Sequence, residues 1–254
     1  MGRATTAVTG APSPATGSSG RPSSPTGRST ASASSKAAAK RRRRRAAKLF
    51  RFDRELGARY VAGADEAGRG SLAGPLVAAA VLIDYERLGL RDRRALGDLD
   101  DSKQRTTEQR EALYPIVVRA AERVAVTVRC VRGIDSRGLH VTNLAALRRS
   151  LERVARPGAI CLVDGFALPG CSVEHRQVIE GDARSAAIAA ASVIAKVTRD
   201  RYMHRADADY PGFGFSDNVG YSTAGHRQAI LRTGPSGLHR RSFQSIAYSQ
   251  LQLG

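Results

Sequence analysis

The sequence has little that would tie it to a membrane or to an oxidising compartment. No apolar run approaches the roughly 18 residues that a membrane-spanning helix needs, so a soluble protein is expected. The three cysteines, Cys130, Cys161 and Cys171, form neither a CxxC pair nor an even disulfide set. All three lie in or near apolar runs, which predicts buried, reduced thiols in a reducing compartment.

Acidic residues are missing from the first 48 positions, which are mostly Ser, Thr, Ala, Gly, Pro and Arg. Such a segment buries too little to offset the entropy lost on ordering, so residues 1–48 are predicted to be a disordered basic arm before a folded domain over residues 49–254. The arm ends in the run Lys40-Arg41-Arg42-Arg43-Arg44-Arg45. A nucleic-acid-binding arm, an organelle transit peptide and a nuclear localisation signal are all open interpretations. We expect a non-catalytic electrostatic tether.

Positive charge is abundant and unevenly spread. The 254-residue chain carries a net charge of +18. Residues 1–55 hold 13 Lys and Arg against 2 Asp and Glu, or +11, and the remainder contributes +7. This balance favours a polyanionic partner, most often nucleic acid or an anionic membrane surface. The alternative is that the positive charge mainly serves solubility.

Apolar spacing in the rest of the chain predicts an α/β fold. Apolar runs predict strands at residues 59–64, 75–83, 124–131 and 159–163. Spacing of three to four residues predicts helices at 106–122, 141–154 and 184–206, with a shorter one between Gly220 and Gly234. The first two strands are expected to form a hairpin-like pair, and residues 88–103 a charged loop. The alanines of the 184–206 helix are expected to let it lie close against a sheet.

Four acids lie at strand ends or turns: Asp65, Glu66, Asp164 and Asp182. Adjacent carboxylates oppose each other's ionisation unless a cation binds them. Carboxylate oxygens suit hard divalent ions, and two such ions can activate water and stabilise the leaving oxygen of a phosphodiester. The Arg in the turn Gly68-Arg69-Gly70 indicates a phosphate partner. Taken singly, Asp164 would equally suit an Asp-Gly turn and Asp182 a helix cap.

Six motifs in order resemble ribonuclease HII, the bacterial form of the type 2 ribonucleases H. They run from about Tyr60 to Phe243 and read Asp65-Glu66-Ala67-Gly68-Arg69-Gly70, Asp101-Ser102-Lys103, Val163-Asp164-Gly165, Gly181-Asp182 with Ala190-Ala191-Ser192 through Lys196 to Arg199-Asp200, Gly220-Tyr221-Ser222-Thr223, and His239-Arg240-Arg241-Ser242-Phe243. The resemblance implies an RNase H-like fold: a central mixed β-sheet flanked by helices, with a C-terminal helical extension.

The resemblance also implies an activity. It implies an endonuclease that hydrolyses the RNA of RNA–DNA hybrids and cuts 5′ of single ribonucleotides embedded in duplex DNA. The products would be 3′-hydroxyl and 5′-phosphate ends. Carried over to this chain, the resemblance makes Asp65, Glu66, Asp164 and Asp182 the catalytic metal ligands, with Mn²⁺ or Mg²⁺ as cofactor.

Substrate-binding residues follow from the same resemblance. The turn Gly68-Arg69-Gly70 becomes the sensor of the ribose 2′-hydroxyl, the group that separates RNA from DNA. Tyr221 becomes the ring beside the junction sugar, and Lys103 and Lys196 become phosphate contacts. His226 and His239 are interpreted as structural. One departure concerns Asn218-Val219, where the family commonly has a basic residue, so phosphate contact by this loop is in doubt.

Two alternatives remain. One is another enzyme on this fold, such as the sister ribonuclease HIII or a structure-specific DNA nuclease. The other is a non-catalytic nucleic-acid-binding protein, which would leave the four acids without a purpose. We expect a monomer in the bacterial cytoplasm, with no membrane partner.

Overall fold

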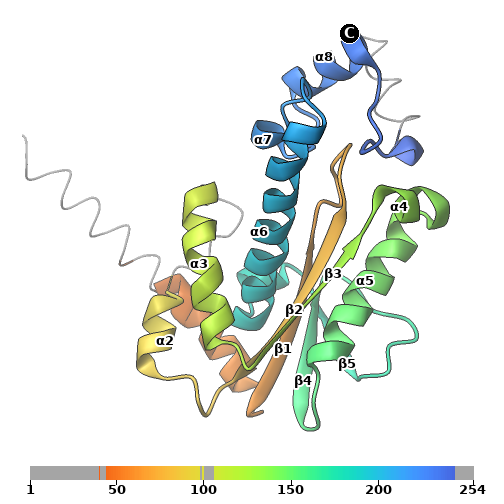
Figure 1. Ribbon diagram of the computed structural model, residues 1–254. Helices are drawn as coiled ribbons and strands as arrows, with labels where there is room; N and C mark the ends of the chain where they lie inside the picture. The colour runs from red at the N-terminus through yellow and green to blue at the C-terminus, as the bar shows by residue number, and fades with distance from the viewer. Residues whose placement is uncertain (1–39, 41–43, 98, 100–105, 244–254) are drawn as a thin grey trace, which may run out of the picture. The chain divides into compact units, whose positions relative to one another are not determined.

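A mixed sheet of five strands forms the centre of the protein (Figure 1). The computed structural model describes residues 40, 44–97, 99 and 106–243. The strands are β1 (Tyr60–Ala67), β2 (Leu76–Asp84), β3 (Arg123–Arg129), β4 (Ala159–Asp164) and β5 (His175–Val178), in the spatial order β3-β2-β1-β4-β5. Because β1 is the middle strand, its acids lie at the end of a central strand and not on an outer strand.

The strand directions bring the acids to one edge of the sheet. β1 pairs with β2 in antiparallel fashion, which confirms the predicted hairpin-like pair, and β2 pairs likewise with β3. β4 runs parallel to β1 on its other side, and β5 parallel to β4. Because β1 and β4 are parallel neighbours, their carboxyl ends lie at the same edge of the sheet.

Helices cover both faces of the sheet, as the predicted α/β class requires. After the helix over residues 44–55, the helices along the chain are α2 (Leu90–Ala95), α3 (Thr107–Ala120), α4 (Val131–Arg137), α5 (Leu139–Val154), α6 (Ala186–Asp209), α7 (Phe215–Asn218) and α8 (Ala224–Thr233). Helices α3 and α6 pack on one face and α5 on the other. Side chains on β2 alternate between the faces: Val77 and Val81 join the apolar core of α3 and α6, and Leu76 and Leu82 join that of α5. This alternation explains why a continuous apolar run is needed at β2.

Helix α6 lies unusually close to β1. A Cβ built on Gly63 would overlap the backbone of Ala187 and Ile188. The alanines at the start of α6 are fully buried, so the predicted close approach of this helix to the sheet is confirmed. It carries Ser192, Lys196 and Arg199 toward the carboxyl end of β1.

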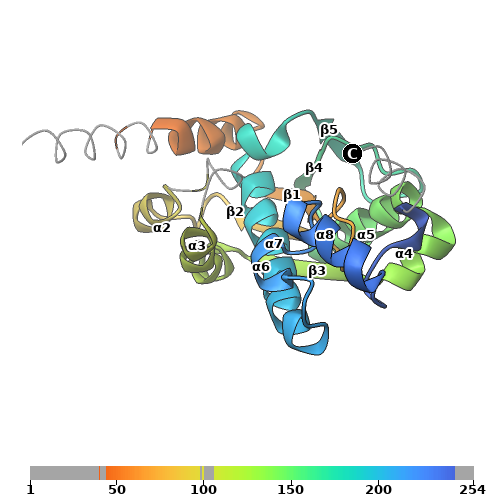
Figure 2. The same ribbon diagram turned by 90° about the horizontal axis from the view of Figure 1, so that it is seen from above.

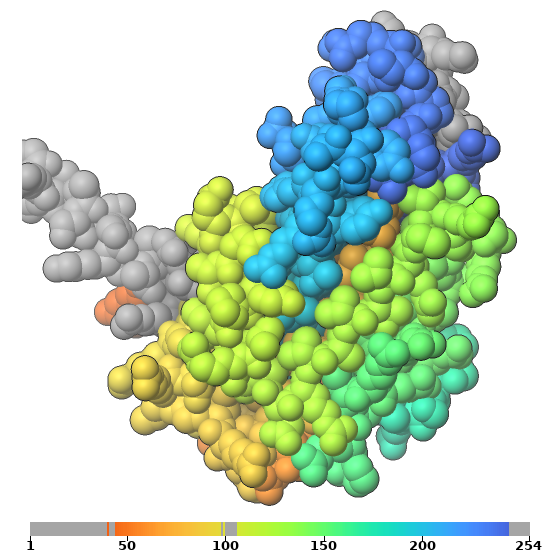
Figure 3. Space-filling view, in the orientation of Figure 1, coloured from red at the N-terminus to blue at the C-terminus, as the bar shows by residue number. Residues whose placement is uncertain are grey.

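The C-terminal part packs around the far end of α6 (Figure 2). Helices α7 and α8 and the short 3-10 turn η3 (Arg241–Phe243) close a third apolar cluster, in which Met203, Phe213, Phe215 and Ile230 take part. In Figure 3 the blue C-terminal segment meets the green surface of α4, where Asp135 accepts backbone hydrogen bonds from Arg241 and Ser242. This is the predicted helical extension.

Some sequence predictions need correction. Residues 44–55 form a helix that buries Ala46, Leu49 and Phe50, so folded structure begins before the predicted residue 49. Residues 90–95 form α2 inside the predicted charged loop, without an apolar repeat to reveal it. The predicted helix at 106–122 is α3, and Thr106 caps its start by accepting a hydrogen bond from the Gln109 amide. Residues 1–39 and Lys103 lie outside the described residues.

The cysteine prediction is partly wrong. Cys161 is buried and Cys171 half-buried, but Cys130 is exposed, because it follows the edge strand β3 and precedes α4. All three are free thiols, and burial raises the pKa of Cys161 to about 11. Within the part of the chain that the structure describes, no helix has the length and apolar character to cross a membrane.

Candidate active site

Three of the predicted acids converge on one cavity at the carboxyl ends of β1 and β4. Asp65 and Glu66 end β1, and Asp164 ends β4. The cavity has a volume of about 480 Å³. Its other lining residues include Ser192, Arg110 and five that the resemblance assigned to the substrate, namely Gly68, Arg69, Gly70, Lys196 and Tyr221. The structure therefore gathers the acids, the turn and the ring, together with basic residues of α3 and α6, from five separate stretches of the sequence into one site.

Asp65 is the most perturbed of these acids. It is 5% exposed, and burial, followed by the charges of Glu66 and Asp164, holds its pKa well above the ordinary value. Its Oδ1 accepts a hydrogen bond of 2.7 Å from the Glu66 amide, and the Ser192 hydroxyl also bonds to this carboxyl. These hydrogen bonds favour the charged form of Asp65, but they do not outweigh its burial and the repulsion from the two neighbouring carboxylates.

Asp164 and Asp182 are connected through Gly181. The Gly181 amide donates a 2.6 Å hydrogen bond to Asp164 Oδ1. Asp182 follows on the short 3-10 turn η2 (Gly181–Ala183) and is buried, but it does not line the cavity itself. It is not the cap of α6 either, since Ser185 accepts the capping bond from Ile188.

The acids suit a divalent metal in their chemistry. Among the described His, Cys, Asp and Glu side chains, no group of three or more is already arranged to hold a metal ion. The donors that line the cavity are carboxylate oxygens, which Mg²⁺ and Mn²⁺ prefer. Burial first, and the neighbouring Glu66 and Asp164 second, raise the pKa of Asp65, and a divalent cation among these acids would favour its charged form. Asp65, Glu66 and Asp164 therefore fit such an ion, with Asp182 adjoining them.

Basic side chains surround the acids in fixed positions. Arg69 is held between Glu66, 3.9 Å away across an ion pair, and the ring of Phe166, whose centroid lies 4.6 Å from the guanidinium carbon. On α6, Lys196 Nζ pairs with Asp200 at 2.8 Å. Arg110 of α3 approaches the other oxygen of Asp200 at 3.5 Å.

Arg110 was missed in the sequence. It lines the cavity and lies on the buried face of α3 together with Leu113 and Val117. The available signal was a charged residue at a position where helical spacing called for an apolar one. A buried charge usually has a partner, and here Asp200 holds both Arg110 and Lys196 toward the cavity.

Tyr221 lies between two cations of α6. Lys196 Nζ is 5.1 Å and the guanidinium carbon of Arg199 is 5.2 Å from its ring centroid. Both distances are within the range of cation–π attraction. The ring is thereby held at the cavity wall.

The histidines that were interpreted as structural do support this loop. His226 and His239 are buried and share a 3.0 Å hydrogen bond between their Nε2 atoms. His226 Nδ1 must donate to the Tyr221 carbonyl, which can only accept, and Ser236 donates its amide to His239 Nδ1. Neutral rings satisfy all these bonds. Burial and the neighbouring His226 lower the pKa of His239 to about 4.

Asn218 has a structural role where the family commonly has a basic residue. Its Nδ2 donates to the Phe213 carbonyl and its Oδ1 accepts from the Gly220 amide, both at 2.7 Å. Both ends of the side chain are thus engaged in shaping the loop before Tyr221.

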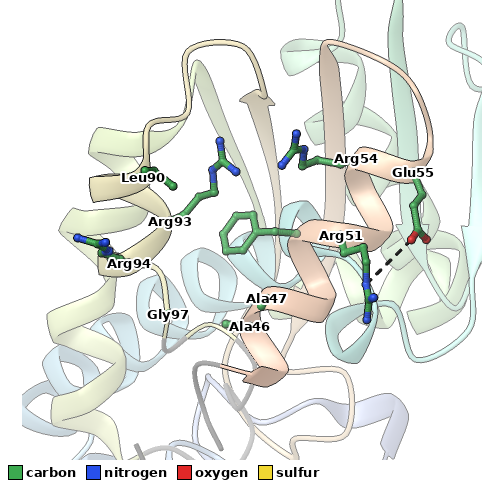
Figure 4. A pocket seen from close by; sticks show the side chains of 10 residues that line it. Ala46, Ala47, Arg51, Arg54, Glu55, Leu90, Arg93, Arg94 and Gly97 are labelled. Carbon is green, nitrogen blue, oxygen red and sulfur yellow. Dashed lines mark ion pairs between the residues drawn. The ribbon is translucent and has the colours of Figure 1, made fainter. Parts of the chain in front are cut away.

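A larger cavity lies elsewhere, between the helix over residues 44–55 and α2 (Figure 4). It measures about 620 Å³ and is lined by Phe50, Leu90 and the four arginines Arg51, Arg54, Arg93 and Arg94. Glu55 is the one carboxylate in its lining and pairs with Arg51 at 4.0 Å. This lining offers no acid cluster, so the smaller cavity is the candidate active site.

Comparisons with known proteins find relatives among the ribonucleases H. A ribonuclease HII of Mycobacteroides abscessus is 48% identical over 187 residues, which cover 73% of this chain and 77% of that protein. The crystal structure of ribonuclease H2 from Pyrococcus horikoshii OT3 matches with a TM-score of 0.63 at 27% identity, over 77% of this chain and 100% of its own. Bst-RNase HIII, solved in complex with Mn²⁺, shares the fold with a TM-score of 0.60 at 20% identity, over 80% of this chain and 73% of its own.

A family model extends the similarity across most of the chain. The model described as ribonuclease HII matches residues 62–246, a range that begins within β1 and contains every acid of the cavity. The chain belongs to the ribonuclease HII family.

Proposed function

We propose that this chain cuts duplex DNA on the 5′ side of a single embedded ribonucleotide and leaves 3′-hydroxyl and 5′-phosphate ends. The coarser activity follows from the family: a ribonuclease H endonuclease that acts on RNA–DNA hybrids and depends on divalent metal. The observation that carries the finer proposal is the single cavity in which three acids meet the Gly68-Arg69-Gly70 turn and Tyr221.

The acids would hold the metal. Asp65, Glu66, Asp164 and Asp182 are the proposed ligands, and Mg²⁺ or Mn²⁺ the proposed ions. When bound, a pair of such ions supplies an activated water and neutralises charge on the phosphodiester. Asp65 is buried at the cavity wall, and the Ser192 hydroxyl orients its carboxyl. Among the described residues that line the cavity there is no histidine, so the role of general base is not given to a histidine.

The turn and the ring would choose the place of the cut. The backbone of Gly68-Arg69-Gly70 is proposed to read the ribose 2′-hydroxyl, since a turn with glycines lets backbone groups approach a sugar closely. Tyr221 is proposed to pack on the neighbouring sugar. Lys196 and Arg110, both oriented by Asp200, would contact the phosphates on either side. Lys103 stays a sequence prediction.

The test is a cleavage assay on three matched duplexes: all-DNA, DNA with one central ribonucleotide, and an RNA–DNA hybrid. With Mg²⁺ or Mn²⁺ we expect one nick 5′ of the ribonucleotide, cutting of the hybrid and no cutting of the all-DNA duplex. EDTA should abolish both reactions. An intact single-ribonucleotide duplex in both metals, beside a cleaved hybrid, would refute the finer proposal and leave the family activity standing.

A further inference from the structure

Arg199 is buried in the middle of the loops that flank the cavity. It extends from α6 and has no exposed surface. Its Nε donates to the Pro75 carbonyl at 3.0 Å, and its Nη2 donates to Ser71 Oγ at 2.8 Å and to the Ala73 carbonyl at 3.0 Å. Its Nη1 donates to the Val219 carbonyl at 2.8 Å. One guanidinium therefore joins the segment after the Gly-Arg-Gly turn to the segment before Tyr221.

The same guanidinium lies directly beneath the turn. Gly68 has a φ of +88°, and a Cβ at this position would overlap the Arg199 side chain. The Ser71 hydroxyl, which accepts from Arg199, donates in turn to the Gly68 carbonyl at 2.9 Å. The conformation of the turn thus depends on Arg199 through both packing and hydrogen bonds.

Arg240 binds the turn from the C-terminal segment. It is 1% exposed, and its Nε and Nη2 donate to the Gly74 carbonyl at 3.1 and 2.9 Å. Its Nη1 donates to the Arg69 carbonyl at 3.2 Å, inside the turn itself. Its backbone amide donates to the Leu72 carbonyl at 2.9 Å.

The two loops are also bonded to each other. The amides of Leu72 and Ala73 both donate to the Gly220 carbonyl, at 2.8 and 3.2 Å. The ring of Tyr221, the next residue, lies against Arg199 as described above. Turn, Tyr221 loop and C-terminal segment are therefore fastened together around two arginines.

Simple packing does not explain this arrangement. Neither arginine forms an ion pair with any carboxylate among the described residues. Removing such charges from water is costly, and apolar side chains usually fill such a volume at less expense. The guanidinium supplies what apolar groups cannot, namely several donors in fixed directions toward carbonyls of different segments.

We propose that Arg199 and Arg240 are positioning residues that fix the Gly68-Arg69-Gly70 turn relative to the Tyr221 ring, so that the ribose and the adjoining sugar are recognised together. This inference rests on the proposed function of that turn and ring. Neither arginine needs to touch the substrate. Recognition of a single ribonucleotide in DNA requires the turn to contact the ribose and the ring to contact the adjoining sugar at the same time. The interior of an RNA–DNA hybrid presents no junction sugar to the ring.

Lysine variants test the proposal, because one ammonium keeps the charge but cannot reach carbonyls spread over three segments. For Arg199→Lys and Arg240→Lys we expect kcat/KM on the single-ribonucleotide duplex to fall about tenfold or more beyond the fall on the hybrid, as misplaced contacts lose orientation. Arg201→Lys is the matched control: this neighbouring arginine pairs with Glu111 on the outside of α6 and should leave the ratio unchanged. Equal losses on both substrates would show a merely structural role and overturn the proposal.

A second readout does not require activity. The chain has no tryptophan, so Tyr221→Trp introduces a unique fluorophore into the loop. Its emission anisotropy in the free protein should fall when Arg199→Lys is added and stay constant when Arg201→Lys is added. An emission anisotropy that stays the same when Arg199→Lys is added would refute the positioning role. If the single-ribonucleotide duplex is never cut but the anisotropy responds as expected, the proposed function fails while the fastening of the loop stands.

Discussion

Asp65 shows how function opposes stability at a single residue. Its carboxyl is buried beside Glu66 and Asp164, and its pKa is raised by burial first and by repulsion from these two acids second. Without metal, Asp65→Asn removes one like charge and keeps an oxygen that can accept the Glu66 amide. We expect the variant to melt higher than wild type in EDTA, by about 2–4 °C for each kcal/mol gained in a chain of this size. Differential scanning calorimetry at pH 7 measures this.

The same substitution should abolish cleavage of the hybrid while leaving its binding intact, because one metal ligand is lost and the basic residues are not. Excess Mg²⁺ should narrow the difference in melting temperature, since the wild type alone gains a full ligand set. Glu174→Gln, an exposed acid, is the control and should change neither quantity. A variant that melts no higher than wild type in EDTA would contradict the account of a strained acid cluster.

Tyr221 offers a second test at the residue scale, because its ring and its hydroxyl can be separated. The ring faces Lys196 and Arg199, and this contact needs only the aromatic face. Tyr221→Phe should therefore cut the single-ribonucleotide duplex within about threefold of wild type, whereas Tyr221→Ala should lose about 1–3 kcal/mol of transition-state binding, as removal of a stacking ring does. Steady-state kcat/KM values on that duplex measure both. Equal losses in the two variants would assign the role to the hydroxyl instead.

At the scale of elements, α6 depends on the helix over residues 44–55. Asp53 of that helix accepts hydrogen bonds from the Ala187 amide at 2.9 Å and from the Tyr85 hydroxyl at 2.7 Å. Burial raises its pKa to about 6. The folded state therefore holds this proton more tightly than the unfolded chain, and the contribution of Asp53 to the unfolding free energy falls as pH rises from about 4 to about 6.

Asp53→Asn should remove this pH dependence, because the amide oxygen can still accept both bonds but cannot ionise. The unfolding free energy of the variant relative to wild type should rise between pH 4 and pH 7 by on the order of 2–3 kcal/mol. Urea denaturation at intervals of one pH unit measures it. Asp53→Ala, which loses the bonds as well, should be less stable than Asp53→Asn at every pH. A relative free energy that stays constant with pH would refute this role for Asp53.

The elements with strong periodicity were those that the sequence could predict. The β1–β2 pair, α5 and α6 have apolar runs or helical spacing that continue long enough to be distinguished from a chance pattern. The helix over residues 44–55 and α2 are rich in arginine; the first buries Ala46, Leu49 and Phe50, whereas α2 buries no residue of its own, so neither shows a clear apolar repeat. The four-residue β5 is too short to show a pattern, because its pairing with β4 decides its structure.

Site residues divide in the same way. The acids were predictable because each lies beside a recognisable motif, and three of them do line one cavity. Arg110, Arg199 and Arg240 were not assigned a role, since the contacts of Arg110 with Asp200, of Arg199 with Pro75 and of Arg240 with Gly74 join positions far apart in the sequence. A single sequence gives no measure of such distances. The buried charge on an apolar helix face was the one clue to Arg110.

At the scale of the whole molecule, charge is concentrated at the N-terminal end of the sequence. The run Lys40-Arg41-Arg42-Arg43-Arg44-Arg45 directly precedes the buried part of the first described helix. The described residues that line the cavity with the acids all lie between Asp65 and Tyr221. Binding and cutting should therefore be separable by shortening the chain.

Two truncations make this separation measurable. A chain that begins at residue 39 lacks four basic residues of the arm but keeps the whole run, and a chain that begins at residue 44 lacks eight and keeps the helix. Each phosphate contact that is lost should reduce the slope of log affinity against log salt by about 0.9, so the second truncation should flatten the slope by up to about 3–4 more than the first if the run binds the duplex backbone. Fluorescence anisotropy on a labelled hybrid from 50 to 300 mM salt (about the range in which such slopes are resolved) measures this slope.

The kcat at saturating hybrid should stay at the full-length value in both truncations, because no acid of the cavity is removed. A kcat that falls with the run, while the melting temperature is unchanged, would place the run in the catalytic step and contradict its role as a tether.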